Sequence, residues 1–212
     1  MKHSLIYFLL LLCLAPLLVE AQQNTLLSGT EKPAFREGLY LTYADFINNK
    51  PAVALDAIEN IESFVALQKG SERIEAPRLI YFMENDEMKS VASNEIWGLC
   101  AFDTPYVFDE KNFYKLEILG AIMKFNNSDH KLWNEKPGLP GQNVATVKLP
   151  KYIVYQTGEV ISEKKDVEKA FSTDSEFFSE YKNSLESDSS PTLDTYIISF
   201  NKRNPVSLPV EL

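Results

Sequence analysis

The stretch from Asn94 to Phe125 reads NEIWGLCAFDTPYVFDEKNFYKLEILGAIMKF and is the longest apolar and aromatic block outside the N-terminus. Two polar segments, one at Asp103-Thr104-Pro105 and one at Asp109 to Asn112, divide this block into three runs. Apolar runs of this length separated by turn residues are typical of consecutive antiparallel strands. The sequence therefore predicts that this block forms the centre of an antiparallel sheet.

The third run shows the strand pattern most clearly. Tyr114, Leu116 and Ile118 alternate with charged residues, so one face of this strand is expected to be buried and the other wet. From Ile118 to Met123 both faces become apolar, as in a strand that passes from the margin of a sheet to its middle. Gly120 lies at this change, which predicts a bulge or a close backbone approach.

The segments on either side of this block predict further strands. Apolar runs bounded by turn residues indicate strands and hairpins. Gly158 is expected in the turn of one such hairpin, where a residue with positive φ is needed. Residues 22–36 show no periodicity and are expected to be a loose lead-in. Residues 53–68 fit helix or strand, and helical spacing favours a helix. Residues 126–142 are expected to form a long loop. The other predicted strands are Gly38–Leu41, Arg78–Met83, Met88–Ala92, Ala145–Leu149 (ended by Pro150), Lys151–Tyr155 and Glu159–Ser162.

The last third of the chain is predicted to be helical. Thr173 and Glu176 have the spacing of a capping box, and Ser190 followed by Pro191 is a typical helix start. Leu193, Tyr196, Ile197 and Phe200 form one stripe, so Tyr196 and Phe200 are expected to anchor the last helix in the core. The predicted fold class is α+β: an antiparallel, meander-like sheet with the C-terminal helices packed on it.

The N-terminus has the three parts of a secretory signal peptide. A positively charged start, an apolar run over residues 4–18, and small residues at Val19 and Ala21 predict cleavage after residue 21. The prediction is therefore a signal peptide at 1–21 and a single mature domain at 22–212, exported to the periplasm or the extracellular space. The mature chain contains no segment that is predicted to span a membrane.

Composition excludes some classes of partner. The formal net charge is −9, and it is unchanged by removal of residues 1–21, which contain one lysine and one glutamate. A net negative charge of this size disfavours nucleic acid as a partner. Cys100 is the one cysteine of the predicted mature chain, so no internal disulfide is expected, and its place in an apolar strand predicts a buried, unreactive thiol.

Several short stretches resemble a group of signal-peptide-bearing bacterial proteins of no assigned function. The stretches are Gly38-Leu39-Tyr40-Leu41-Thr42-Tyr43, Asp45-Phe46, Asn49, Pro51, Ile96-Trp97-Gly98, Phe113-Tyr114-Lys115-Leu116, Gly120 and Asn201-Lys202-Arg203-Asn204-Pro205. Members of the group often carry an Asp-Gly turn after the Trp-Gly strand, where this chain has Phe102-Asp103-Thr104-Pro105. The resemblance implies export and a shared fold, and it implies no particular activity.

The sequence contains few residues with catalytic potential. His130 is the one histidine after residue 21, in a polar segment where an exposed bystander is expected, and Trp133 lies beside the Pro/Gly-rich segment. These two are weak ligand-contact candidates; no cofactor or metal is predicted, since histidine-based metal spacings, Walker-type loops and EF-hand patterns are missing. Glu95 and Asp109 flank predicted strands and are expected to be turn and edge residues.

Two functions from different classes remain open. The first is a non-enzymatic exported module that binds an unknown protein or envelope component, and a flat apolar patch would favour it. The alternative is a carboxylate-based hydrolase acting on an extracytoplasmic substrate, which a pocket with two acidic side chains of shifted pKa would favour. A structural envelope component without a small ligand is a third possibility.

Overall fold

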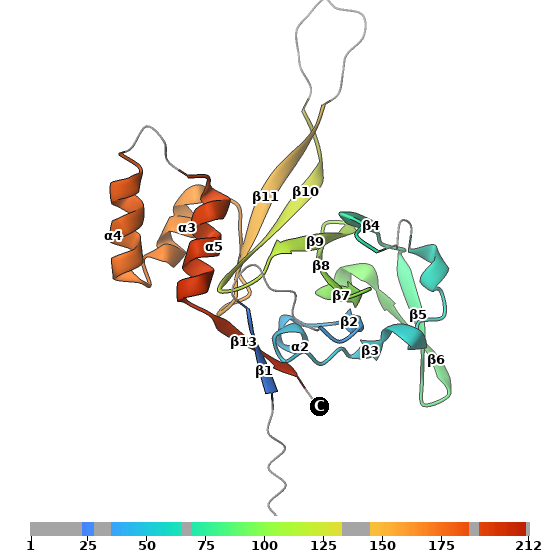
Figure 1. Cartoon of the computed structure of the whole chain (residues 1–212). Helices are drawn as coiled ribbons and strands as arrows, with labels where there is room; N and C mark the ends of the chain where they lie inside the picture. Colours follow the sequence, from blue (N-terminus) through green and yellow to red (C-terminus); the bar gives the residue numbers. More distant parts are fainter. Residues whose placement is uncertain (1–22, 28–34, 65–68, 133–144, 187–190, 211–212) are drawn as a thin grey trace, which may run out of the picture.

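The computed structural model describes residues 23–27, 35–64, 69–132, 145–186 and 191–210 (Figure 1). In this part of the chain, four α-helices accompany a large antiparallel sheet, and most of the helices lie in the C-terminal third. The predicted α+β class is therefore confirmed. The signal peptide predicted at residues 1–21 lies outside the described residues.

Six strands that follow one another in the chain are also neighbours in the sheet, so the predicted meander is confirmed. All of these pairs are antiparallel. The sheet continues from β7 to β2 and β3, and β4 pairs with β9 beside β10. The strands are β7 (Gly98–Ala101), β8 (Thr104–Asp109), β9 (Asn112–Ile118), β10 (Ile122–Leu132), β11 (Ala145–Val154), β12 (Val160–Ile161), β2 (Gly38–Tyr40), β3 (Val53–Ala54) and β4 (Arg73–Glu75).

The turn between β7 and β8 is shifted from its predicted position. Phe102 and Asp103 make the turn, both with positive φ, while Pro105 lies in β8 opposite Cys100. The next turn, at Glu110 with φ of 58°, falls where the second polar segment predicted it.

Gly120 lies in a turn and not in a bulge, because the third apolar run forms two strands, β9 and β10. Its φ is +148°, and a Cβ atom there would come within 2.5 Å of the Asn201 side chain. The predicted close approach is confirmed, although the neighbour is a side chain and not backbone. Asn201 accepts a hydrogen bond from the Ile122 N–H at 2.9 Å and donates one to the Ile122 carbonyl at 2.8 Å. These bonds tie the last helix to the turn.

The β10–β11 hairpin is longer than predicted. Residues 126–132, predicted as part of a loop, belong to β10, and residues 133–142 lie outside the described residues. The prediction that Pro150 ends a strand is also wrong, since β11 runs through it. Pro150 pairs with Asn126 on one side, and β12 pairs with β11 only at Tyr152 and Ile153, so the missing N–H of Pro150 costs no ladder bond on the open side. The following turn is confirmed, with Gly158 at φ of 71°.

The helix predicted over residues 53–68 is wrong for the described residues 53–64. They form β3 and two single 3₁₀ turns, at Leu55–Ala57 and Ile61–Ser63. Ile58 forms a bridge with Phe82, and the Asn60 side chain bonds to the backbone of a neighbouring strand. Long-range contacts therefore decide the structure of this segment in place of its helical spacing.

The predicted lead-in contains a strand. β1 (Gln23–Leu27) pairs antiparallel with the last strand, β13 (Val206–Val210), as a separate two-stranded sheet. Leu27 and Leu208 are fully buried in one core cluster, together with residues of β2 and β10. The start and the end of the described chain thus close the same part of the core.

A second two-stranded sheet is formed by β5 (Leu79–Glu84) and β6 (Glu87–Ala92), as predicted. The turn residues Asn85 and Asp86 have φ of 51° and 62°, which suits the tight two-residue turn between these strands. The inner face of the hairpin buries Ile80 and Phe82 in a core cluster that also contains residues of β7, β8 and β9.

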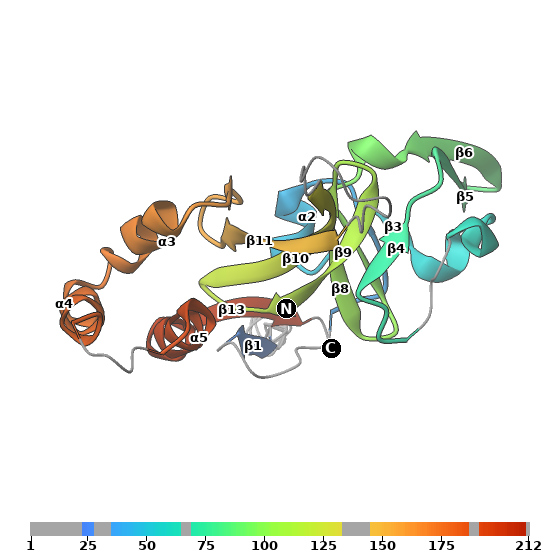
Figure 2. The same cartoon turned by 90° about the horizontal axis from the view of Figure 1, so that it is seen from above.

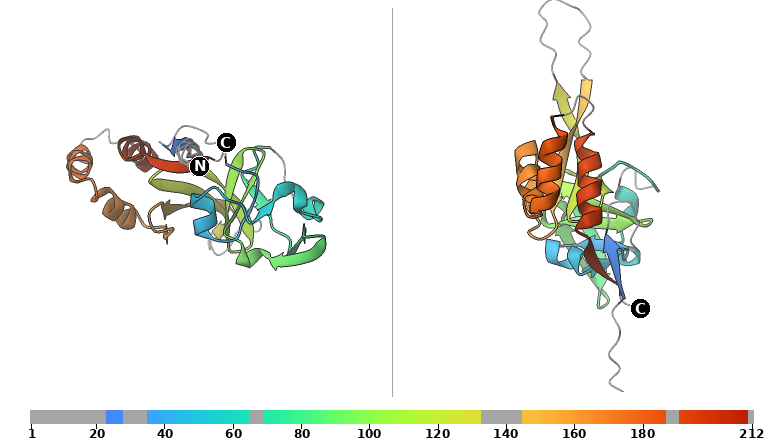
Figure 3. Two further views of the ribbon diagram at one scale, coloured as in Figure 1. Left: turned by 90° about the horizontal axis from the view of Figure 1, so that it is seen from below. Right: turned by 60° about the vertical axis from the view of Figure 1, so that its left-hand side comes forward.

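The helices are α2 (Tyr43–Ile47), α3 (Lys164–Phe171), α4 (Ser175–Ser184) and α5 (Leu193–Arg203). The C-terminal three lie against one side of β10 and β11 (Figure 3), and Ile122 and Tyr152 of those strands share a core cluster with Phe171 and Phe200. Seen from above, these helices and the β5–β6 hairpin occupy opposite ends of the molecule (Figure 2). None of the helices among the described residues has the length and apolarity needed to cross a membrane.

Two predicted helix caps differ from the structure. Asp174, and not Thr173, caps α4 by accepting a hydrogen bond from the Phe177 N–H at 3.0 Å. Thr192 caps α5, and Ser190 lies outside the described residues.

The anchors predicted for α5 are confirmed in part. Phe200 is buried, whereas Tyr196 is half-buried and places its hydroxyl 2.5 Å from that of Ser184.

Candidate functional site

The structure does not bring together the two predicted ligand-contact residues, His130 and Trp133, because only His130 is among the described residues. His130 lies in β10 opposite Val147, not in a loop. Trp133 lies outside the described residues, so its prediction stays a prediction.

The apolar block places its two chemically distinctive side chains in or beside the core. Cys100 is fully buried, and burial, with smaller effects from Glu37 and Asp103, raises the pKa of its thiol to about 12. A thiol with that pKa is protonated and unreactive near neutral pH. Trp97 is half-buried, with its ring centroid 4.4 Å from that of Phe46 and 5.2 Å from that of Tyr43.

The carboxylates that flank the central strands have structural partners. Asp109 lies 2.5 Å from the Lys151 ammonium and accepts a hydrogen bond from Asn127 at 2.7 Å. Glu95 accepts a hydrogen bond from the Ala92 N–H at 3.2 Å. Both residues therefore hold turns and strand edges, as the sequence predicted.

A pocket of about 240 Å³ lies where α5 ends, beside the turn that precedes β10 and the turn that follows β11, which are at the same end of this antiparallel pair. All ten lining residues are uncharged. They are Ala121, Ile122, Val154, Gln156, Ala170, Thr173, Phe200, Asn204, Pro205 and Val206.

Two of the polar lining residues, Thr173 and Asn204, already make hydrogen bonds within the protein. The Thr173 hydroxyl donates to the Ala170 carbonyl, and the Asn204 side chain donates to Asp174 and to the Phe200 carbonyl. The pocket thus offers apolar walls and few polar groups, without an acid or a base among its lining residues.

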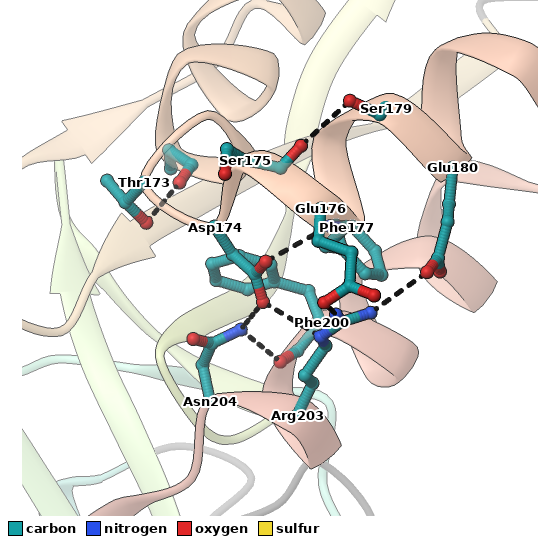
Figure 4. Close-up of polar contacts among 11 residues, drawn as sticks. Thr173, Asp174, Ser175, Glu176, Phe177, Ser179, Glu180, Phe200, Arg203 and Asn204 are labelled. Carbon is teal, nitrogen blue, oxygen red and sulfur yellow. Dashed lines mark hydrogen bonds and ion pairs between the residues drawn. The ribbon is translucent and has the colours of Figure 1, made fainter.

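The charged cluster next to this pocket serves to join helices (Figure 4). Arg203, at the end of α5, forms ion pairs with Asp174 at 3.0 Å, with Glu180 at 3.2 Å and with Glu176. The hydrogen bond from Phe177, together with Asn204 and the charge of Arg203, lowers the pKa of Asp174. Arg203 therefore bridges the end of α5 to α4.

The outer face of the β5–β6 hairpin is apolar and exposed. Among the described residues nine large apolar side chains are exposed, and four of them lie on this hairpin. Their exposed fractions are 37% for Leu79, 41% for Tyr81, 36% for Met83 and 58% for Met88. Isolated apolar residues on a surface are ordinary, but a contiguous group of them indicates an interaction site.

These four side chains are neighbours because of the strand register. Leu79, Tyr81 and Met83 are spaced by two along β5, so they point to one face, and Met88 lies directly opposite Met83. Ser90 and Ala92 continue the same face on β6, opposite Tyr81 and Leu79. We call these six residues the outer hairpin face.

Sequence reasoning missed this face, although it predicted both strands. A run such as Leu79 to Met83 is apolar on both faces, which is the usual pattern of a strand buried on both sides. The signal that could have found it was the charged tip: three acids and a lysine, at Glu84, Asp86, Glu87 and Lys89, enclose Met88 and favour a solvent-exposed hairpin.

A metal centre is not indicated within the part of the chain that the structure describes, where histidine, cysteine and acidic side chains form no group of three or more suited to a metal ion.

Comparisons with protein-family models, with curated proteins and with solved structures gave no match.

Proposed function

We propose that this chain is an exported protein that binds a partner protein through the outer hairpin face. The observation that carries this proposal is the exposure of Leu79, Tyr81, Met83 and Met88 on one side of a two-stranded sheet. Tyrosine and methionine are enriched at protein interfaces, because they bury large areas with adaptable or amphipathic side chains.

The charges around the face suggest the chemistry of the partner. The tip carries Glu84, Asp86 and Glu87 against one lysine, Lys89, which already pairs with Glu84. The partner that fits is therefore a protein with an apolar surface strip and basic residues at the end that meets the tip, because complementary charges steer association.

The alternative, a carboxylate-based hydrolase, finds less support. Such enzymes hold one carboxyl group protonated by raising its pKa while a second stays ionised. Among the described carboxylates with a shifted pKa, all three are lowered: Glu72 by Lys148, Glu168 by Lys182 and Tyr181, and Asp174 as above. The uncharged lining of the pocket beside Asn204 likewise favours binding over acid–base chemistry.

Export is the second part of the proposal, and it rests on the signal-peptide pattern of residues 1–21. Mass spectrometry of the secreted form should give a chain that begins at Gln22. Retention of residues 1–21, or a lipid on Cys13, would contradict it.

Binding through the face can be tested by placing a benzophenone amino acid at Tyr81 and identifying the protein that it cross-links in envelope and secreted fractions. Calorimetry with that purified protein should then show about tenfold or greater loss of affinity for the double variant Tyr81→Ser/Met88→Ser, as for the central residues of an interface.

Leu149→Ser is the matched control, since Leu149 is 40% exposed on β11 and does not belong to the hairpin. The proposal fails if the double variant binds as tightly as the Leu149→Ser control, or if Tyr81 cross-links to no protein.

A further inference from the structure

The backbone of β6 has one side turned away from β5. In an antiparallel pair, residues alternate between those that exchange hydrogen bonds with the partner strand and those whose N–H and C=O point outward. Tyr81 belongs to the second kind, because its N–H donates to the Asn60 side chain and its carbonyl accepts from the Glu59 N–H. Ser90 lies opposite Tyr81, so its backbone groups point outward from the other side of the hairpin.

The same alternation assigns the rest of β6. Met88 and Ala92 lie two residues from Ser90, so their N–H and C=O groups also point away from β5. The contact made by Ala92 confirms this direction, since its N–H donates to the Glu95 carboxylate at 3.2 Å.

The two outer edges of the hairpin differ in how they are covered. On β5, Glu59 and Asn60 bond to Tyr81, and Asn60 also donates to the Leu79 carbonyl at 3.0 Å. On β6, the Glu95 carboxylate accepts a hydrogen bond from the Ala92 N–H. Within the described residues, the N–H and C=O groups of Met88 and Ser90 have no hydrogen-bond partner. An open edge thus lies beside the outer hairpin face.

Natural proteins usually protect an open edge with proline, a bulge or an inward-pointing charge. β6 contains no proline, and its six residues pair with β5 in unbroken register. β6 does carry charges on the inner side of the hairpin, at Glu87 and Lys89, and the charge of Lys89 is paired with that of Glu84. The edge at Met88 and Ser90 is therefore open to a further strand.

We propose that an extended segment of the partner protein adds to β6 as a third strand, held by the backbone of Met88 and Ser90. This inference rests on the proposed function and specifies how the outer hairpin face recognises its partner. The added strand runs antiparallel to β6, so the residues that bond to Met88 and Ser90 lie directly opposite them and place their side chains on the same side as Tyr81 and Met88. Those residues should be apolar, and the residue at the acidic tip should be basic.

A second copy of this chain fits the edge poorly. The antiparallel self-pairing that uses Met88 and Ser90 on both copies places Lys89 directly opposite Lys89 of the other copy. Like charges in that position destabilise a strand pair. This register therefore disfavours a second copy, and the proposal assigns the edge to a different chain.

The test uses the synthetic peptide acetyl-Val-Thr-Val-Thr-Val-Lys-amide, which in antiparallel addition pairs its valines with the outer face and places its C-terminal lysine at the acidic tip. Nuclear magnetic resonance titration should shift the amide signals of Met88 and Ser90 and slow their hydrogen exchange. Ser90→Pro removes the outward N–H without removing a bond to β5 and should weaken binding about tenfold or more, whereas the control Leu149→Ser, outside the hairpin, should bind as the parent does.

A second measurement does not depend on the folding of the proline variant. The same peptide N-methylated at its three valines keeps its side chains and loses the N–H groups that would face β6, so it should not bind. Strand addition is overturned if the N-methylated peptide binds as well as the unmethylated peptide. It is also overturned if the unmethylated peptide shows no binding at about 1 mM, since a Kd of that size corresponds to a binding free energy of only about 4 kcal/mol.

Other outcomes separate this inference from the function on which it rests. If the peptide binds and Tyr81→Ser/Met88→Ser weakens it while Ser90→Pro has no effect, strand addition is wrong and the face still binds. If the protein without peptide forms a dimer that Ser90→Pro abolishes, the occupant is a second copy and the assignment to a different chain is overturned. The cross-linking experiment at Tyr81 decides the proposed function independently.

Discussion

The C-terminal helices and the β5–β6 hairpin both carry closely spaced apolar side chains, yet the hairpin leaves one of its two apolar faces exposed. In the helical layer, the ring of Phe171 lies 5.2 Å from those of Phe177 and Phe200, and all three are buried. On the hairpin, Ile80 and Phe82 are buried on the inner face while the outer hairpin face is exposed. The difference comes from the number of packed layers. The apolar stripe of a helix needs one neighbouring layer, whereas a hairpin that is apolar on both faces needs two, and the described residues supply one of them.

The largest effect that tests this comparison should come from Phe200→Ala. Phe200 is 3% exposed and packs against two other phenylalanines, so the variant should lose about 3–5 kcal/mol of unfolding free energy through lost burial and the cavity left behind. Denaturant titration measures the loss. An unchanged midpoint would show that α5 is not docked on the sheet.

Asn201→Ala should have the next largest effect. Asn201 is fully buried and holds both backbone groups of Ile122, so its removal leaves a buried donor and acceptor without partners, at a cost of about 1–3 kcal/mol. The loss should appear in denaturant titration, with faster hydrogen exchange at the Ile122 amide. If that amide exchanges at the same rate as in the parent, the hydrogen bonds from Asn201 to Ile122 do not stabilise the β9–β10 turn.

A smaller effect should come from pH, through the contacts of α4. The pKa of Asp174 is lower in the folded chain than in the unfolded chain, where it is about 3.9. The folded state is therefore stabilised above about pH 4, and this contribution is lost as the pH falls through the folded pKa.

Asp174→Asn, which keeps an oxygen at the helix cap, should reduce this acid sensitivity, measured as the thermal midpoint between about pH 6 and pH 3. The prediction is contradicted if the variant and the parent lose stability in parallel over that range.

The smallest effect on stability should come from Met88→Ser, in spite of the loss of a large apolar side chain. Met88 is 58% exposed, and substitutions at such positions usually change the unfolding free energy by less than about 0.5 kcal/mol. A loss comparable to that of Phe200→Ala would mean that the outer hairpin face is covered by this chain itself, and the comparison between the two regions would fail.

Local patterns in the sequence predict much of this fold. Alternation at Tyr114, Leu116 and Ile118 identifies β9, and the apolar stripe of Leu193, Ile197 and Phe200 identifies α5. These patterns work because burial on one face leaves a direct periodicity in the chain.

The parts that could not be predicted depend on distant residues. Residues 53–64 are not helical because they bond to β5 instead. Ile58 forms a bridge with Phe82, and Tyr81 binds both the Glu59 N–H and the Asn60 side chain. The exposure of Tyr81 could not be read from its strand, since it depends on whether another layer covers it. The binding face was therefore the least predictable feature, although its strands were predicted correctly.

The pairing of β1 with β13 has a consequence for the time at which the fold can form. The register joins Gln23 to Val210, so the first described strand finds its partner only after nearly the whole chain is available. Contacts between residues so distant in sequence slow folding, because a large loop must close before they stabilise the product. Leu27 and Leu208 complete the central core from these two strands, and that core therefore stays open until the last strand arrives.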